Sequence, residues 1–275
     1  MYRIAASDLD GTLLRDDKTI SEEMMNELVR ITDQGVIFLP STGRTHRELP
    51  LAIRGLPFIH YALCCNGGSV YDYDNDCYIY EDGIPYETAL EVLEYAKDLQ
   101  VYETVVVNGE RIAQGDENDE LCEYIRKVAV KDILFNFKGA YDVKKAFAEK
   151  HMNAQKILLY LDDGGNRDEV MKDLSDRFPQ LSVSSSGPKF IEVNSRGVNK
   201  GKALVDFCKR MDIPIEETLA FGDAGNDIEL LDAAGMAIVT ENGTDEAKKH
   251  ADMICPSNND DGVGKALKEL IPKEG

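Results

Sequence analysis

The most informative part of the chain is the stretch Ser7-Asp8-Leu9-Asp10-Gly11-Thr12-Leu13-Leu14. It follows directly on the stretch 2–6, which is apolar except for Arg3 and predicts a buried strand. Asp8 and Asp10 stand just past the strand end, where like charges repel each other and no structural requirement calls for them. They are explained if a cation lies between them, or if one carboxylate attacks while the other transfers a proton. The alternative is an ordinary polar turn after a strand.

Length and charge narrow the class of protein. At 275 residues the chain is longer than one typical domain, and its apolar fraction of 43% is enough to build real cores. The net charge of -20 argues against nucleic acid and anionic membranes as partners, because both require a Lys/Arg-rich surface. The chain starts without a signal-like segment and has no apolar run of about 18 residues, so we expect a cytoplasmic protein. Nothing in the sequence implies a protein partner.

The cysteines and histidines do not suggest a metal site. No CxxC pair is present, and no cysteine stands at metal-binding spacing from a histidine. We therefore expect reduced, structural thiols, which as small apolar groups fit buried strands such as residues 61–65. The only histidine near a candidate site is His46, which we expect on a helix surface. The six cysteines are Cys64, Cys65, Cys77, Cys122, Cys208 and Cys255.

A second polar strand end follows one helix later. Ser21 predicts the N-cap of a helix over residues 21–34, and Gly35 predicts its stop. The apolar run 36–39 predicts a buried parallel strand, and it ends in Pro40-Ser41-Thr42-Gly43-Arg44. A hydroxyl and a glycine in this place suit a phosphate oxygen, although hydroxyl residues also commonly cap helices. Arg44 pairs with a phosphate or braces a carboxylate, and we favour the brace.

The middle of the chain predicts a strand, a hairpin and then an inserted domain. The strand 61–65 leads to Asn66-Gly67-Gly68, and hairpin strands follow over 69–71 and 77–80. Asn66 either touches a bound substrate or forms a turn with Gly67, and the sequence leaves both interpretations open.

From about residue 84 to 193 no strand end carries carboxylates. Helices are predicted over 89–99, 119–128, 143–150 and 167–178, and strands over 104–107, 156–161, 182–184 and 190–193. We interpret this part as an inserted α/β domain. Its linkers would be Gly83-Ile84-Pro85 and Asn194-Ser195-Arg196-Gly197.

Charged groups return after the insertion. Lys200 opens a helix predicted to end at Met211 and has no P-loop spacing around it; a single helical lysine is normally solvated. The strand 218–221 ends in Gly222-Asp223-Ala224-Gly225-Asn226-Asp227, and a helix over 228–233 and a strand over 236–239 follow. Three strand ends thus carry groups suited to a phosphate or a cation. In a parallel α/β sheet such ends lie along the edge where ligands bind.

Four motifs in fixed order resemble the haloacid dehalogenase superfamily. They are Asp8-Leu9-Asp10-Gly11-Thr12, Ser41-Thr42-Gly43-Arg44, Lys200 and Gly222-Asp223-x-x-Asn226-Asp227. The long insertion and the stretch 251–263 are similar to the Cof-type branch of its phosphatases. The resemblance implies an α/β fold, in which a Rossmann-like parallel-sheet core (1–83 and 194–275) carries an inserted α/β cap (84–193) that sets substrate specificity. No motif in the insertion matches, so the identity of the substrate is not carried over.

The resemblance also implies a role for each motif residue. Asp8 is similar to the family's nucleophile and Asp10 to its general acid/base. Phosphate would be held by the backbone of Leu9 and by Thr42, Gly43, Lys200 and Asn226. Magnesium would be bound by Asp8, the carbonyl of Asp10 and Asp223, with Asp227 as outer support. Electrostatics agrees, because these aspartates would repel a phosphate dianion unless a hard dication with oxygen ligands were present.

The implied activity is the magnesium-dependent hydrolysis of small phosphorylated metabolites, with sugar phosphates as the best candidates. Asp8 would attack phosphorus to form an aspartyl-phosphate. Asp10 would protonate the leaving oxygen and then take a proton from the water that cleaves the intermediate. A phosphomutase of the same superfamily is one alternative, which product analysis would separate. A sensor that only binds a phosphometabolite is another, but binding alone needs no nucleophile.

Overall fold

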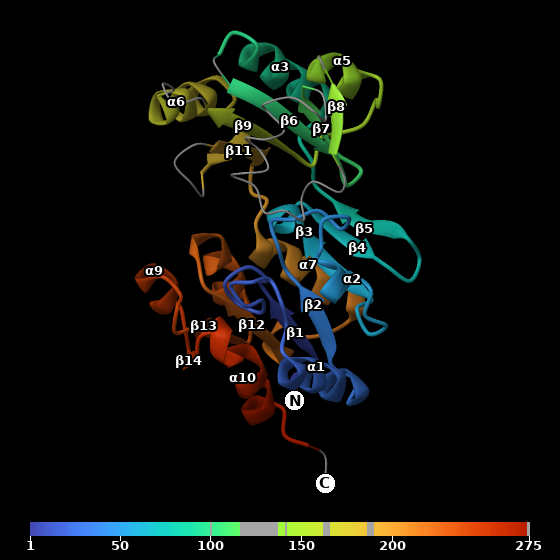
Figure 1. Ribbon diagram of the computed structural model, residues 1–275, viewed down its shortest axis with the longest axis vertical. Coiled ribbons are helices and arrows are strands. Elements are labelled where there is room, and N and C mark those ends of the chain that lie inside the picture. The colour runs from blue at the N-terminus through green and yellow to red at the C-terminus, as the bar shows by residue number, and fades with distance from the viewer. Residues whose placement is uncertain (100, 116–136, 141, 162–165, 186–189, 274–275) are drawn as a thin grey trace. The chain divides into compact units, whose positions relative to one another are not determined.

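The computed structural model describes residues 1–99, 101–115, 137–140, 142–161, 166–185 and 190–273 (Figure 1). The chain separates into two compact units. The first consists of Met1–Arg44, Leu49–Tyr80 and Asn199–Gly275, and the second of Thr45–Glu48 and Glu81–Val198. These limits lie within a few residues of the boundaries expected near 83 and 194. The short stretch Thr45–Glu48 differs, because it falls in the second unit although it is far from the long insertion in sequence.

The first unit is built on a five-stranded parallel sheet with the strand order β14-β13-β12-β1-β2. β1 lies between β2 and β12, so that Ser7 stands opposite Pro40 on one side and Phe221 on the other. The three polar strand ends therefore lie side by side at one edge, and the predicted α/β fold with a parallel-sheet core is confirmed. The strands are β1 (Ile4–Ser7), β2 (Ile37–Pro40), β12 (Thr218–Gly222), β13 (Met236–Thr240) and β14 (Met253–Cys255).

Helices cover both faces of this sheet, because side chains alternate along each strand. Ala5 of β1 packs in one apolar cluster with residues of α1 and α10. Its neighbours Ile4 and Ala6 pack in another cluster with residues of α7 and α8. As predicted, Ser21 caps α1, and its Oγ accepts a hydrogen bond from the N–H of Met24 at 2.9 Å. The four helices are α1 (Glu22–Asp33), α7 (Lys200–Met211), α8 (Ile228–Ala233) and α10 (Gly262–Leu270).

Shorter elements complete the first unit. β3 (Tyr61–Cys64), β4 (Ser69–Asp72) and β5 (Cys77–Glu81) form a separate sheet in which β3 and β4 run antiparallel. The strand predicted over 61–65 therefore exists, but it is not part of the parallel sheet. The other short elements are the helices α2 (Leu51–Arg54) and α9 (Asp245–Lys248) and the 3-10 helices η1 (Cys65–Gly67), η3 (Ile215–Glu217), η4 (Gly225–Asp227) and η5 (Asn258–Asp260).

The second unit is a six-stranded sheet with the order β10-β11-β9-β6-β7-β8. Most neighbours run antiparallel, while β7 and β8 are parallel. The helices α3, α5 and α6 lie on one face of the sheet (Figure 1), where they bury alternate strand residues such as Val105, Ile157 and Ile191. The elements are α3 (Tyr86–Ala96), β6 (Val101–Val107), β7 (Glu110–Gln114), β8 (Phe137–Ala140), α5 (Val143–Ala148), β9 (Lys156–Leu161), α6 (Arg167–Arg177), β10 (Leu181–Ser184) and β11 (Phe190–Ser195).

The sequence pattern located most of these elements but not all of them. The strands β7, β8 and β14 and the helices α2, α9 and α10 were not predicted. In β7 the charged and polar residues Glu110, Arg111 and Gln114 interrupt the apolar run. The helix predicted over 119–128 lies outside the described residues. None of the five described cysteines forms a disulfide, and four of them are buried. Within the described part of the chain, no helix has the length and apolar character needed to cross a membrane.

Candidate active site

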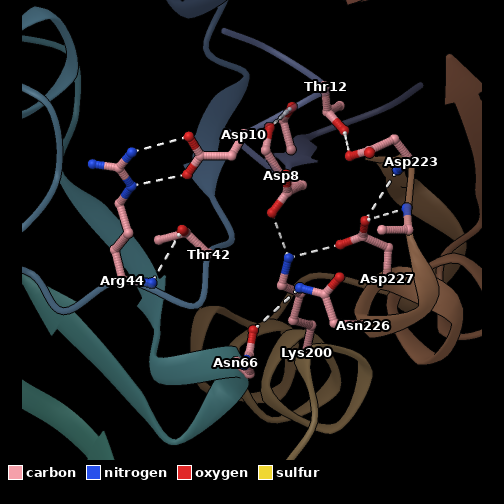
Figure 2. Close-up of polar contacts among 12 residues, drawn as sticks. Asp8, Asp10, Thr12, Thr42, Arg44, Asn66, Lys200, Asp223, Asn226 and Asp227 are labelled. Atoms are coloured by element: carbon pink, nitrogen blue, oxygen red, sulfur yellow. Dashed lines mark hydrogen bonds and ion pairs between the residues drawn. The ribbon is translucent and has the colours of Figure 1, made fainter. Parts of the chain in front are cut away.

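Lys200 lies at the centre of the polar edge of the first unit (Figure 2). Its Nζ is 2.6 Å from Asp8 Oδ1 and 2.7 Å from Asp227 Oδ1, and its side chain has no exposed surface. The lysine is the first residue of α7, whose N-cap Asn199 accepts a hydrogen bond from the N–H of Lys202 at 2.7 Å. The next residue must be small, because a Cβ on Gly201 would lie 1.9 Å from the carbonyl oxygen of Glu229. The sequence position of Lys200 thus places one cation between two buried carboxylates.

The charges of this cluster perturb one another. Burial raises the pKa of Asp8 to about 8, an effect that Lys200 opposes and Asp227 reinforces. Burial alone would lower the pKa of Lys200, but Asp227 and Asp8 outweigh it and raise the pKa above its ordinary value. One lysine therefore remains charged between two carboxylates, but it does not keep Asp8 easily ionised.

Asp223 reaches the same cluster from the end of β12. Thr12 Oγ1 donates a hydrogen bond to Asp223 Oδ1 at 2.7 Å. Asp227 Oδ2 accepts hydrogen bonds from the backbone N–H of Asp223 at 3.0 Å and of Ala224 at 3.1 Å, which fixes the turn that carries both carboxylates. Gly11 has φ +91° and lies so near that a Cβ there would be 2.7 Å from Asp223 Oδ2, so only glycine fits.

Three carboxylates converge closely enough to ligate one metal ion. Oxygens of Asp8, Asp223 and Asp227 lie within 4.8 Å of one another. Oxygen donors of this kind suit a hard dication such as Mg²⁺. Asp227 is already occupied by Lys200 and two backbone N–H groups, so Asp8 and Asp223 are the better direct ligands. The donor set therefore fits the expected metal.

Asp10 points to the other side of the site, where it meets two cations. Arg44 contacts both carboxylate oxygens at 2.9 Å, and Lys18 Nζ lies 2.8 Å from Oδ1. Burial would raise the pKa of Asp10, but Arg44 and Lys18 outweigh it and lower the pKa. The expectation that Arg44 braces a carboxylate is confirmed. Lys18 was missed, because a lysine in a turn after two aspartates carries no distinctive signal in the sequence.

The residues expected to hold phosphate lie near Asp8 and Asp10 (Figure 2). Thr42 Oγ1 accepts a hydrogen bond from the N–H of Arg44 at 3.2 Å, and a Cβ on Gly43 would lie 3.0 Å from Asn66 Oδ1. Asn226 Nδ2 donates to the same Asn66 oxygen at 3.3 Å. Asn66 forms a turn with φ +55°, as one of its two interpretations predicted, and contact with a substrate stays a prediction. The side chain of Leu9 is buried in the core, which leaves only its backbone for a ligand.

Two sequence expectations need comment. His46 is not on a helix surface: it lies buried in a turn, where its ring packs over Gly109. Thr12 was part of the opening motif but was given no role, although it is the hydrogen-bond donor that orients Asp223. Its position directly after Gly11, in the same motif as the two aspartates, is the sequence feature that could have indicated this role.

Comparison with known proteins agrees with this geometry. Residues 5–267 match the haloacid dehalogenase-like hydrolase family. The chain belongs to this family. It is 29% identical over 273 residues to the 5-amino-6-(5-phospho-D-ribitylamino)uracil phosphatase YitU of Bacillus subtilis, covering 98% of this chain and 97% of that protein. It is 26% identical over 279 residues to the pyridoxal phosphate phosphatase YbhA of Escherichia coli, covering 96% and 97%.

The fold is shared with solved structures. The crystal structure of TM0651 from Thermotoga maritima matches with a TM-score of 0.85 at 29% identity, covering 100% of this chain and 99% of that one. A haloacid dehalogenase-like hydrolase from Bacteroides thetaiotaomicron matches with a TM-score of 0.86 at 26% identity, covering 98% and 100%. The family predicted from the motifs, its Cof-type branch and the enzyme class, a phosphatase of the haloacid dehalogenase type, are thereby confirmed.

Proposed function

We propose that the protein is a magnesium-dependent phosphatase that hydrolyses small phosphorylated metabolites through an aspartyl-phosphate on Asp8. The observation that carries the proposal is the buried cluster of Lys200 with Asp8 and Asp227, which adjoins Asp223 and faces Asp10. Burial raises the pKa of Asp8 to about 8, so Asp8 becomes the anion that can attack phosphorus once a further positive charge lies beside it.

The metal would be held by Asp8 and Asp223, together with the carbonyl of Asp10, while Asp227 supports Asp223 through its backbone. Bound Mg²⁺ would supply the positive charge that keeps Asp8 ionised and neutralises the oxygens of the phosphate. Thr12 keeps one oxygen of Asp223 engaged and so orients the other toward the ligand position.

Asp8 and Asp10 would carry out different steps of the reaction. Asp8 forms a bond to phosphorus as the bond to the ester oxygen breaks, and Asp10 gives that oxygen its proton. Water then attacks the same phosphorus, passes its proton to Asp10 and releases inorganic phosphate from Asp8. Arg44 and Lys18 favour the carboxylate form of Asp10, which is the form that accepts the proton from water. Lys200, Thr42, Gly43, Asn226 and the backbone of Leu9 would hold the phosphoryl oxygens.

The proposed substrates are phosphate esters of small metabolites, with sugar phosphates as the first to test. The two relatives described above are named for a ribityl phosphate and for pyridoxal phosphate, at similar identity. These names support a small phosphate ester as the substrate of this protein. They do not indicate which leaving group it prefers, which depends on residues of this chain. We propose that residues 84–193 make that choice as a cap, since they carry no carboxylate motif of their own. Exchanging them for those of a relative is expected to change the preferred substrate and keep the metal requirement.

The proposal is tested by phosphate release over a panel of phosphorylated metabolites. Release is expected to stop in excess chelator and to return with Mg²⁺, whereas Ca²⁺ restores little because its larger and looser coordination misaligns attack. Product analysis on sugar bisphosphates serves as the control for a mutase, which moves phosphate between positions and releases little. Full turnover in excess chelator would contradict the proposal.

A further inference from the structure

A fourth strand end lies at the polar edge of the first unit. β13 runs parallel to β12 with Val239 opposite Gly222, so the residues after these two strands are neighbours. At the end of β13 the chain turns over residues 240–244, which we call the β13 turn, and the N–H of Gly243 donates to the carbonyl of Thr240 at 2.8 Å. The sequence marked no residue of this turn as part of the site, yet the turn contacts both loops that are expected to bind the metal.

The β13 turn contacts the loop that carries Asp223. The N–H of Thr244 donates a hydrogen bond to the carbonyl of Asp223 at 2.8 Å. Gly243 lies against the same carbonyl: a Cβ there would be 3.1 Å from the oxygen of Asp223 and 2.8 Å from Cγ1 of Val239. The close approach of the turn to Asp223 therefore depends on a residue without a side chain.

The same turn contacts the loop that follows β1. Asn242 Nδ2 donates a hydrogen bond to the carbonyl of Gly11 at 2.7 Å. Gly11 joins two groups of the site, since the carbonyl of Asp10 belongs to the peptide unit before its Cα and Thr12 to the unit after it. With φ +91° and no side chain, Gly11 has little steric restriction of its own on rotation. The bond from Asn242 supplies that restriction.

The orientation of the Asn242 amide is set by Asn258. The backbone N–H of Asn258 donates to Asn242 Oδ1 at 3.0 Å. A backbone N–H can only donate, so it selects the amide oxygen and leaves Nδ2 for the Gly11 carbonyl. Asn258 is itself 2% exposed, and its Nδ2 donates to the carbonyl of Leu14 at 2.9 Å. Two asparagines that are bonded to each other thus hold the loop after β1 at two of its carbonyls.

These contacts converge on the hydrogen bond between Thr12 and Asp223 (Figure 2). The backbone of Thr12 is held through its neighbour Gly11 by Asn242. The backbone of Asp223 is held by the N–H of Thr244. One turn therefore fixes both partners of the bond that orients Asp223.

We propose that Asn242 is a positioning residue for the metal: by holding the Gly11 carbonyl it keeps the two loops that carry the expected ligands in the arrangement that binds Mg²⁺. This inference rests on the proposed function, in which Asp8, Asp223 and the carbonyl of Asp10 hold the metal. Groups behind the direct ligands typically change metal affinity by about 10–100-fold, because they fix the orientation of those ligands. Asn242 is exposed, so its removal leaves the packing of the core intact.

The test is the variant Asn242→Ala, with the Kd for Mg²⁺ measured by titration calorimetry without substrate. We expect the Kd to rise by at least about tenfold. Asn259→Ala is the matched control, because this exposed asparagine exchanges two hydrogen bonds with Asp16, further along the same loop, at 3.1 and 2.9 Å. The control is expected to change the Kd by less than about twofold. A rise below about tenfold in Asn242→Ala, or an equal rise in the control, overturns the inference.

Two further readouts separate positioning from a general loss of structure. In chelator, exchange of the Leu14 amide, which donates to the carbonyl of Leu9 at 2.8 Å, is expected to be at least about tenfold faster in Asn242→Ala. The amides of β1 and β12 are expected to change by less than about threefold, and equal acceleration of all these amides overturns the inference. If Asn242→Ala does not accumulate as folded protein, Asn242→Gln keeps the amide at a longer reach, and the same effects are expected in smaller size.

The outcome for Asn242 is distinguishable from the outcome for the proposed function. Phosphate release by the unaltered protein over the panel of esters tests the proposed function, whereas the ratio of Kd values tests the role of Asn242. If the unaltered protein binds Mg²⁺ and releases no phosphate, the proposed function fails, and a raised Kd in the variant still supports the positioning role. If the unaltered protein releases phosphate with Mg²⁺ and the Kd is the same in both proteins, only the role of Asn242 is overturned.

Discussion

Replacing Lys200 by Met removes the cation that contacts both Asp8 and Asp227. Both contacts are short, 2.6 and 2.7 Å, and none of the three side chains has more than 8% of its surface exposed. A charge-assisted hydrogen bond in such a place contributes about 1.5–3 kcal/mol. Loss of one partner from a buried pair costs about 3–5 kcal/mol, because the remaining charge stays buried. We therefore expect Lys200→Met to lower the free energy of unfolding of the first unit by about 3–5 kcal/mol at pH 7.5.

Hydrogen exchange is the suitable assay, because the chain has no tryptophan and two units that need not unfold together. The amides of β1 and β12 report on the first unit alone, and added chelator removes any contribution of bound metal. Lys209→Met is the matched control, since this lysine is on the same helix, 72% exposed and 3.5 Å from Asp206. The control is expected to change stability by less than about 0.5 kcal/mol.

Two further results follow from the same reasoning. The double variant Lys200→Met/Asp227→Asn removes one of the stranded charges and is expected to recover part of the loss. The penalty of Lys200→Met is expected to shrink as pH falls from 7.5 to 5, because the folded variant takes up protons on its buried carboxylates before the unfolded chain does. A loss below about 1 kcal/mol, or a loss equal to that of the Lys209 control, would refute the argument that this lysine holds the cluster together.

Two other predictions concern single positions. Gly201→Ala is expected to lower the free energy of unfolding by about 1–3 kcal/mol, because its Cβ would lie 1.9 Å from a backbone oxygen of α8. In the control Gly225→Ala the new Cβ meets nothing within 4 Å, so little change is expected in the same hydrogen-exchange measurement. Glu103→Gln is expected to stabilise the second unit at pH 8 by about 1–3 kcal/mol and to have little effect near pH 4.5. Burial raises the pKa of Glu103 from 4.5 to about 7, so the folded state holds a proton that the unfolded chain releases as pH rises through this window; a stability difference independent of pH in denaturant titrations would contradict this.

Much of the site could be predicted because its residues are marked locally. Asp8, Asp10, Thr42 and Asp223 each stand just past a short apolar run, and the parallel order of β1, β2 and β12 brings those strand ends together. Short continuous apolar runs are enough to locate such buried strands in the sequence. Lys200 was found by its place in a motif, since nothing in a helical lysine foretells that it will be fully buried.

The parts that escaped prediction depend on contacts between residues far apart in sequence. Lys18 stands in an ordinary turn, and only the folded chain brings it to Asp10. Thr45–Glu48 was assigned to the core because no change of composition marks this stretch, and only the folded chain brings Glu48 to Arg111, 63 residues later. His46 was misplaced for the same reason, because Gly109, which makes room for its ring, lies far from it in sequence.

The central claim, that Asp8 carries the phosphoryl group, is tested most directly by trapping it there. In Asp10→Asn, rapid mixing with an activated aryl phosphate is expected to give a burst of phenol followed by slow turnover, because the first step needs little protonation and the second still needs a base. Loss of the base slows hydrolysis by about a hundredfold to ten-thousandfold. Mass spectrometry of the quenched protein is expected to find the phosphoryl group on Asp8, and Asp8→Asn is expected to show none. If Asp10→Asn gives neither burst nor adduct while the unaltered enzyme turns over normally, the assignment of the two aspartates is wrong.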